Sequence, residues 1–329
     1  MKARPLICSI TPDSLRTWPE GSVAVVAHDA GAARLLFSWL ESLDHQLNFC
    51  ATGPAQKMLQ RERPTTKIFS DPRSCLKGCK LLLSGTGWSS SIEHQARLIA
   101  SKQSIKSIAV LDHWVNYQER FMRNGISQLP DNFWVSDEEA KKIATNLFPS
   151  IPATQLPNLW MNDVISKVEF YRAKFGKKAP QLPAKNLLYL SEPTRDRNSG
   201  KQTHEELQHL EHWISQIPML TAKGWVDPYQ AQLRIRIHPS EALTKYDDWT
   251  TKYTCQWPLS IDKEASLEKS LAQADLAFGY ETQALVAAVR CGIKAISCTP
   301  PQKERGRLPH QEILRLDTFN QGKQAYLSQ

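Results

Sequence analysis

The sequence has no long apolar run, which excludes an evident membrane span. No stretch approaches the roughly 18 uninterrupted apolar residues that a membrane helix needs. The N-terminal segment MKARPLICSITPDSL also lacks the apolar core of a secretory signal peptide. We therefore expect a cytoplasmic protein, with peripheral association at the inner face of the membrane as a further expectation from its basic charge.

A regular cysteine pattern is also missing, which excludes a disulfide framework. The seven cysteines are scattered, and most lie in or beside apolar segments. An odd number without regular spacing predicts reduced, buried thiols. Cys75 and Cys79 could share a helical face, but no second Cys or His pair has a spacing that completes a zinc site. We expect no metal.

No nucleic-acid-binding motif is present, although the formal net charge is +8. The Lys and Arg residues are dispersed and the aromatic residues form no RNP-like pattern, which argues against nucleic acid as a partner. A basic charge suits anionic ligands instead, because it raises their local concentration. A cleft for sugar phosphates fits this charge.

Strand and helix patterns alternate in both halves of the 329-residue chain. Buried-strand runs such as SVAVVA and KLLLS are followed by a small or polar turn and an amphipathic helix, and the pattern restarts at NLLYLSEP. This order predicts an α/β protein with two Rossmann-like domains, whose parallel sheets face across a cleft. We expect an N-terminal domain over 1–160, a linker over 161–185 and a C-terminal domain over 186–329. The run KERGRLPHQEILRL predicts a closing helix.

Polar residues cluster where predicted strands of the first half end, and a doubly wound sheet directs such loops into one crevice. In the first loop, His28 and Asp29 precede the small residues Ala30 and Gly31, which permit a close backbone approach at a helix start that favours anions. Asp29 is expected to be a general base for an acceptor hydroxyl, with His28 as neighbour or alternative. In the alternative interpretation Asp29 only caps the helix.

Two further loops are expected to bind the sugar or the acceptor. The loop 84–91 contains Gly-Thr-Gly but neither a P-loop ending nor a complete GxGxxG. Its amides and hydroxyls can line a pocket, and Glu93 can bind a hydroxyl. The alternative is that the loop is only a capped tight turn. In the segment 111–121, aromatic rings can stack on a sugar while polar groups bind its hydroxyls, or the rings can pack at a domain edge. The residues expected to bind sugar or acceptor are Gly31, Thr86, Gly87, Ser89, Asp112, His113, Trp114 and Tyr117.

Motifs in the second half resemble those of a known enzyme superfamily. The sequence Arg-Ile-His-Pro-Ser-Glu follows a predicted strand, and Gly-Tyr-Glu-Thr precedes the helix pattern ALVAAVRCG. This arrangement resembles the donor-binding domain of GT-B glycosyltransferases over most of the second half. The pair His238-Pro239 is similar to the one that marks bacterial sialyltransferases, which use CMP-linked donors.

The resemblance implies that the second half binds a nucleotide sugar. His238 would contact the nucleotide or phosphate, and Arg195, Arg236 and His238 would supply positive charge for the leaving group. The donor-binding residues so implied are His238, Pro239, Ser240, Glu192, Arg195, Gly279, Glu281, Thr282, Ser297 and Thr299. The acidic motif departs from the family pattern, because the segment 28–31 has one carboxylate and an inserted alanine.

We therefore predict a metal-independent glycosyltransferase without a further cofactor. Asp29 or His28 would deprotonate an acceptor hydroxyl, which attacks the anomeric carbon while the second domain stabilises the departing nucleotide. The favoured donors are CMP-linked acidic sugars such as sialic, pseudaminic or legionaminic acid or Kdo, with UDP sugars as an alternative. The acceptor would be a glycan or a lipid-linked molecule of surface glycan biosynthesis. The alternatives are a hydrolysing UDP-sugar 2-epimerase and a non-catalytic nucleotide-sugar-binding protein on the same fold.

Overall fold

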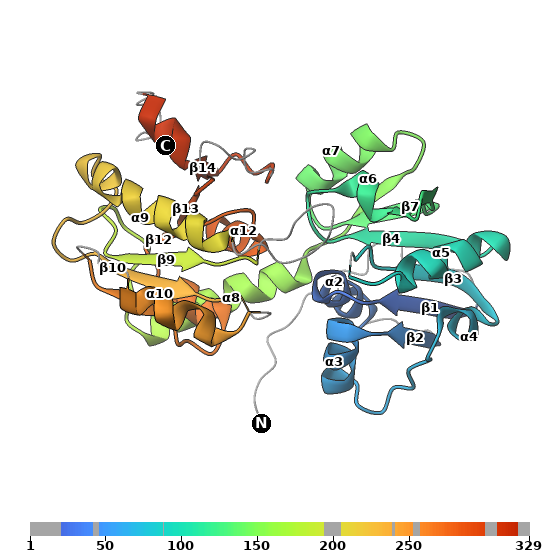
Figure 1. Ribbon diagram of the computed structural model, residues 1–329. Helices are drawn as coiled ribbons and strands as arrows, with labels where there is room; N and C mark the ends of the chain where they lie inside the picture. The colour runs from blue at the N-terminus through green and yellow to red at the C-terminus, as the bar shows by residue number, and fades with distance from the viewer. Residues whose placement is uncertain are drawn as a thin grey trace. The chain divides into compact units, whose positions relative to one another are not determined.

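The computed structural model describes residues 21–41, 46–87, 89–193, 205–238, 241–252, 257–299 and 308–321. The chain divides into two compact units, Met1–Trp160 and Met161–Gln329. Each unit contains one six-stranded parallel sheet. Figure 1 shows helices packed on both sheets. This is the α/β class that the alternating pattern predicts. Within the described ranges, no helix is both long and apolar enough to cross a membrane.

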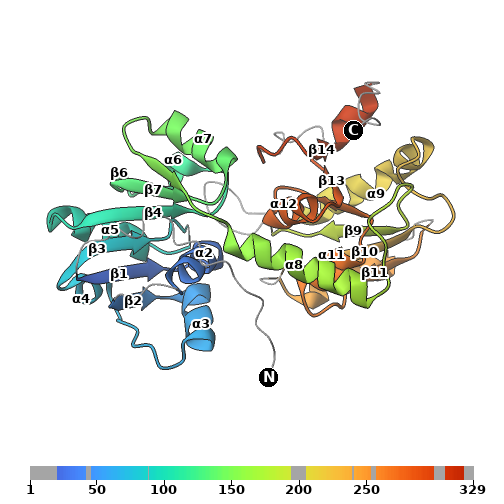
Figure 2. The ribbon, with the colours of Figure 1, turned by 180° about the vertical axis from the view of Figure 1, so that it is seen from behind.

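The first sheet has the strand order β2-β1-β3-β4-β7-β8, and Figure 2 shows its first five strands stacked in this order from bottom to top. Its strands are β1 (Ser22–Ala27), β2 (Leu47–Ala51), β3 (Cys79–Ser84), β4 (Lys106–Leu111), β7 (Asn132–Val135) and β8 (Ala153–Gln155). The chain goes from β1 to β2 on one side and returns to β3 on the other. The winding therefore reverses between β1 and β3.

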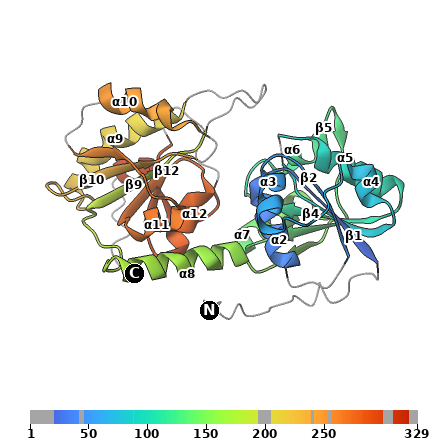
Figure 3. The ribbon, with the colours of Figure 1, turned by 90° about the horizontal axis from the view of Figure 1, so that it is seen from below.

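Helices cover both faces of this sheet, which is why its strands are apolar on both sides. In Figure 3, α2 (Ala30–Leu40) and α3 (Gly53–Glu62) lie on one side and α4 (Pro72–Leu76) and α5 (Ile92–Lys102) on the other. Val25 packs in the cluster that contains Leu36 of α2, whereas Val26 packs in the cluster that contains Ala96 of α5. Full burial of one such aliphatic side chain contributes about 2 kcal/mol. The remaining elements are α6 (Tyr117–Arg120), β5 (Met122–Arg123), β6 (Ile126–Ser127) and α7 (Glu138–Leu147).

The second sheet has the order β11-β10-β9-β12-β13-β14, so its winding reverses between β9 and β12. Its strands are β9 (Asn186–Leu190), β10 (Gln232–Arg236), β11 (Leu259–Ile261), β12 (Leu276–Gly279), β13 (Lys294–Ser297) and β14 (Ile313–Arg315). Figure 3 shows α9 and α10 on one side of these strands and α11 and α12 on the other. The helices are α8 (Leu159–Lys174), α9 (Glu206–Ala222), η1 (Leu243–Tyr246), α10 (Asp247–Lys252), α11 (Leu267–Ala272), α12 (Gln283–Arg290) and η2 (Leu316–Gln321).

The closing helix predicted near the C-terminus is wrong where the structure describes it. Ile313–Arg315 is strand β14, and Ile313 pairs in parallel with Ala295 of β13. Pairing with the open edge of β13 outweighs the local helix pattern, because the strand preference of a segment depends on its neighbours. Residues 303–307 of the same segment lie outside the described residues.

The stretch expected to be a linker has regular structure. Most of α8 lies within 161–185, and just before it Ala153–Gln155 adds β8 to the first sheet. The acceptor and donor roles that the sequence suggests for the two halves stay predictions.

The described cysteines agree with the prediction of reduced, buried thiols. They are free and buried: Cys50, Cys75, Cys79, Cys291 and Cys298. Burial is the main reason that the pKa values of Cys50 and Cys291 rise to about 11, so neither thiol ionises near neutral pH.

Candidate active site

The loops that follow β1 and β3 are neighbours at the carboxyl edge of the first sheet. These two strands pair directly, and the winding reverses between them. In open α/β sheets, ligands bind in the crevice at such a switch point. The loop after β1 holds His28 and Asp29, and the loop after β3 begins at Gly85. The fold therefore brings together two loops that the sequence marked separately.

Asp29 stands at the N-cap position of α2, but its side chain makes no capping hydrogen bond. Its Oδ2 lies instead against the backbone of Gly87, where an added Cβ would be only 2.3 Å from that oxygen. His28 Nε2 lies 3.8 Å from Asp29 Oδ1, and His28 Nδ1 is 2.8 Å from Thr52 Oγ1. The Asp29 side chain is 31 % exposed. The structure thus does not support the capping interpretation, and it leaves the carboxylate accessible at the switch point.

Glu93, in the first turn of α5, connects the same two loops. Its Oε1 accepts a hydrogen bond from the backbone N–H of His28 at 2.9 Å, and its Oε2 accepts one from Gly87 at 2.5 Å. Burial, helped by the charge of Asp29, raises the pKa of Glu93 to about 7, against the opposing effect of the two amides and Arg97. A carboxyl group that titrates near neutral pH can hold or release a proton under physiological conditions.

Asp112 and Arg120 bring the loop after β4 to this edge. Arg120 Nη1 donates to Asp112 Oδ1 at 2.9 Å and to Thr86 Oγ1 at 3.1 Å. The other oxygen of Asp112 lies against Gly31, where an added Cβ would be 2.0 Å from it. Thr86 is fully buried and donates to the carbonyl of Val110 at 2.9 Å. Asp112, Thr86 and Gly31 therefore hold three loops together.

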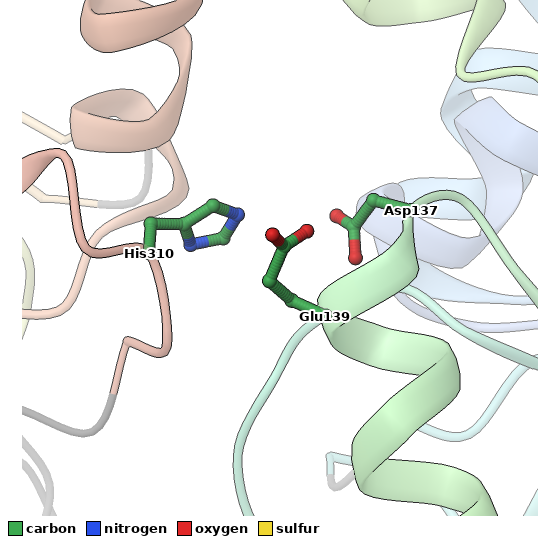
Figure 4. Close-up of side chains that lie close together, drawn as sticks. All are labelled: Asp137, Glu139 and His310. Atoms are coloured by element: carbon green, nitrogen blue, oxygen red, sulfur yellow. The ribbon is translucent and has the colours of Figure 1, made fainter.

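Trp114 and Tyr117 are packed into the first unit. Trp114 is 4 % exposed and Tyr117 is 2 % exposed. Neither ring therefore has the open face that stacking on a sugar needs. Trp114 Nε1 donates to both carboxylate oxygens of Asp137, at 3.0 and 2.9 Å. Asp137 also caps α7, and Figure 4 shows its side chain and that of Glu139 at the start of this helix. The placement favours the packing alternative over the predicted stacking role.

Two other residues of the predicted sugar site have a more open position. His113 is half-buried, and its Nδ1 accepts a hydrogen bond from the N–H of Trp114 at 3.0 Å. Ser89 is exposed in the loop before α5.

In the second unit, Glu192 contacts the backbone of Glu281 at the switch between β9 and β12. Glu192 follows β9, and its Oε2 accepts a hydrogen bond from the backbone N–H of Glu281 at 3.2 Å. Thr282 caps α12 by accepting from Ala284 N at 3.3 Å. Gly279 must be small, because an added Cβ would lie 2.9 Å from a backbone oxygen of β9. These predicted donor residues therefore gather at one point.

The hydroxyl groups after β13 lie beside the same loop. Ser297 Oγ donates to the carbonyl of Tyr280 at 3.1 Å and lies 3.3 Å from Thr299 Oγ1. Ser297 is only 6 % exposed, whereas Thr299 is partly exposed. The order of β12 and β13 in the sheet thus places both of these predicted donor-binding residues next to the turn that starts α12.

The loop after β10 contains the half-buried His238, whose carbonyl accepts from Glu241 N at 2.9 Å. Arg195, Pro239 and Ser240 lie outside the described residues. Arg236, expected to counter phosphate charge, instead pairs with Asp262 at 3.3 Å. Asp262 also pairs with Arg234 at 3.4 Å, so this one carboxylate is shared by two arginines. The role of Arg236 toward a leaving group stays a prediction.

No protein-family model and no curated protein sequence matches the chain. Solved structures do. The UDP-GlcNAc 2-epimerase from Methanocaldococcus jannaschii is 13 % identical with a TM-score of 0.52, and the alignment covers 84 % of this chain and 83 % of that one. The chain has the GT-B fold. The UDP-GlcNAc 2-epimerase from Neisseria meningitidis, bound to UDP-GlcNAc, is 11 % identical with a TM-score of 0.50, and the alignment covers 80 % of this chain and 78 % of that one. MurG from Acinetobacter baumannii is 12 % identical with a TM-score of 0.48 and coverage of 86 % and 79 %.

Sequence reasoning left two residues of the first switch point without a main role. The sequence suggested only that Glu93 binds a hydroxyl. Its position in the first turn of the helix after a Gly-Thr-Gly loop is the signal that could have indicated a larger role. Arg120 gave no signal of its own, since its partners Asp112 and Thr86 come from two other segments. Both residues belong to the candidate site.

Proposed function

We propose that this chain is an enzyme that acts on a nucleotide-activated sugar, and specifically a glycosyltransferase. The observation that carries the proposal is the placement of two carboxyl groups, Asp29 and Glu93, at the switch point of the first sheet. An acceptor hydroxyl must lose its proton as it attacks the anomeric carbon. An accessible carboxylate beside a buried acid that titrates near neutral pH is suited to take that proton.

Asp29 is the proposed base because it is accessible and does not cap its helix. His28 Nε2, 3.8 Å away, can share or relay the proton. Glu93 is less suited to direct contact with an acceptor, because it is 1 % exposed and both of its oxygens accept backbone amides. The acceptor is proposed to be a glycan or lipid-linked molecule, met in the cytoplasm or at the inner face of the membrane.

The second unit is proposed to bind the donor. The start of α12 offers backbone N–H groups and the positive end of a helix dipole, which favour phosphate without a metal. The hydroxyls of Ser297 and Thr299 lie beside this turn. His238 follows β10, which is separated from β12 by β9. A CMP-linked acidic sugar is the first donor to test, and support for CMP comes from the His238-Pro239 pair in the sequence.

A thermal-shift screen with CMP, UDP, GDP and dTDP tests this proposal first. A ligand at about 100 times its dissociation constant adds roughly 2.7 kcal/mol of stability, which is visible as a rise in the melting temperature. We expect CMP to give the largest shift. Mass spectrometry should then detect free CMP and a glycosylated acceptor when the matching CMP sugar and acceptor are both present. No shift with any nucleotide would contradict the proposal.

A hydrolysing UDP-GlcNAc 2-epimerase is the second candidate function. It is favoured by the likeness in fold to two such enzymes and by a third carboxylate, Asp112, near Asp29 and Glu93. Epimerisation moves a proton at carbon, which needs an acid and a base. Incubation with UDP-N-acetylhexosamine alone separates the two functions, because an epimerase needs no acceptor and releases UDP together with the epimer.

A further inference from the structure

The Gly85-Thr86-Gly87 motif has a steric purpose in this structure. An added Cβ on Gly85 would lie 2.3 Å from Oε1 of Glu93, and one on Gly87 would lie 2.3 Å from Oδ2 of Asp29 and 3.1 Å from Oε2 of Glu93. Neither glycine has a positive φ, so close approach and not backbone conformation requires them. The two glycines therefore leave room for the side chains of Asp29 and Glu93, which come from different elements.

Glu93 binds the backbone of two loops at once. The His28 amide, held by Oε1, directly precedes Asp29, and the Gly87 amide, held by Oε2, belongs to the residue that Asp29 touches. Hydrogen bonds to a charged group are stronger than those between neutral groups. One ionised side chain therefore bridges the loop that carries Asp29 and the loop that carries Gly87.

The charged surroundings of Glu93 are mixed. Asp29 faces it from the loop after β1 and disfavours its ionised form, whereas Arg97 of its own helix favours that form. Arg97 is itself held by Ser84 Oγ and the carbonyl of Gly85 at 3.0 and 2.9 Å. Arg123, from β5, reaches the same loop by donating to the carbonyl of Gly87 at 2.6 Å.

We propose that Glu93 is the positioning residue for Asp29: when ionised it holds the amides of His28 and Gly87 together, and when protonated it releases at least one of them. This inference rests on the proposed function, in which Asp29 is the base. In a protonated carboxyl group the oxygen that carries the proton is a poor acceptor, so the group binds two amides less tightly than the carboxylate does. The enzyme thus places its base only when this buried acid has lost its proton.

Amide hydrogen exchange followed by NMR tests the proposal without turnover. In the wild-type chain, protection of the His28 or Gly87 amide, corrected for the intrinsic rate, should fall by about tenfold as the pH is lowered from 8 to 6. In Glu93→Gln, where one oxygen is replaced by an N–H donor, protection should be low at both pH values. Glu119→Gln is the matched control, because Glu119 is exposed in α6. Protection that is independent of pH in the wild type and unchanged in Glu93→Gln would overturn the proposal.

Kinetics supply a readout that a purely structural role would not move. Glu93→Gln should lower kcat by about tenfold or more, leave the donor KM within about twofold, and remove the rise of kcat through neutral pH. A kcat profile that keeps this rise in Glu93→Gln would overturn the positioning role. A chain without turnover on any nucleotide sugar would remove the proposed function instead, while the exchange experiment would still decide whether Glu93 holds the two loops.

Discussion

Nη1 of Arg120 lies 2.9 Å from Oδ1 of Asp112, in an ion pair whose side chains are only 7 % and 16 % exposed. The same Arg120 nitrogen reaches Thr86 Oγ1, so the pair joins the loop after β4 to the loop after β3. Asp112 also limits the size of residue 31 at the start of α2. One ion pair thus fixes the relative positions of three strand-end loops around Asp29.

Removing the positive partner of this pair should destabilise the first unit. Arg120→Met keeps the length of the side chain but leaves Asp112 buried without its cation, which costs about 3 kcal/mol. Arg61→Met is a matched control, because Arg61 pairs with Glu62 at the same 2.9 Å but is 75 % exposed, and its loss should change the free energy of unfolding by less than about 0.5 kcal/mol. Chemical denaturation followed by tryptophan fluorescence measures both. Equal effects of the two substitutions would argue against a structural role for the buried pair.

Gly31→Ala should destabilise the protein although it lies in a helix. Alanine in a helix is normally favoured over glycine by about 1 kcal/mol. Here the new Cβ would lie 2.0 Å from Asp112 Oδ2, and the resulting shift should cost about 1–3 kcal/mol. The free energy of unfolding from denaturant titration checks the sign. A Gly31→Ala protein more stable than the wild type would show that Asp112 does not occupy this space.

The titration of Glu93 should make global stability fall as the pH rises. Burial raises its folded-state pKa from 4.5 to about 7, so between these values the folded state binds more protons than the unfolded state. The stabilising contribution is therefore complete below about pH 4.5 and is lost as the pH rises through 7, by about 3 kcal/mol in total. The difference between wild type and Glu93→Gln across this range isolates the effect. A difference that does not vary with pH would exclude an elevated pKa.

This global trend is opposite to the local trend expected for the two amides. Ionised Glu93 is costly to bury, yet it is the form that accepts both N–H groups. At higher pH the unit should thus be less stable overall and more ordered at His28 and Gly87. Finding both trends in one sample would separate the positioning effect of Glu93 from its effect on the free energy of unfolding.

Transfer should not depend on a divalent metal. The carboxylates of the first switch point have partners of other kinds, since Glu93 accepts two amides and Asp112 pairs with Arg120. We propose that the helix start at α12 and His238 stabilise the departing nucleotide. Activity in excess EDTA should therefore stay within about twofold of the untreated rate. A loss of activity that Mg²⁺ or Mn²⁺ restores would contradict metal independence.

The fold could be predicted because its central strands carry a strong signal. The runs that became β1 and β9 are apolar on both faces, and the repeated order of strand and helix implies parallel pairing. Short edge strands carried no such signal. Ala153–Gln155 and Ile313–Arg315 become strands only because the edges of β7 and β13 are open to them.

The candidate site could be predicted in part, for a physical reason that differs between residues. The positions of Asp29 and Glu281 could be predicted because both follow strands of a doubly wound sheet, and such strand ends meet at one edge. Trp114 bonds to Asp137, which lies in another segment, and Arg236 pairs with Asp262, which follows the neighbouring strand β11. Such pairings between distant segments are set by tertiary structure and leave no periodic pattern in the sequence.

Steady-state kinetics of Asp29→Asn test most directly whether Asp29 takes the acceptor proton. Asparagine has the same shape as aspartate but cannot act as a base, so kcat should fall by about 10²–10⁴-fold while the donor KM and the melting temperature stay close to wild type. Nucleotide release with a matched CMP sugar and acceptor, quantified by mass spectrometry, gives both constants. Transfer by Asp29→Asn at the wild-type rate would contradict the account.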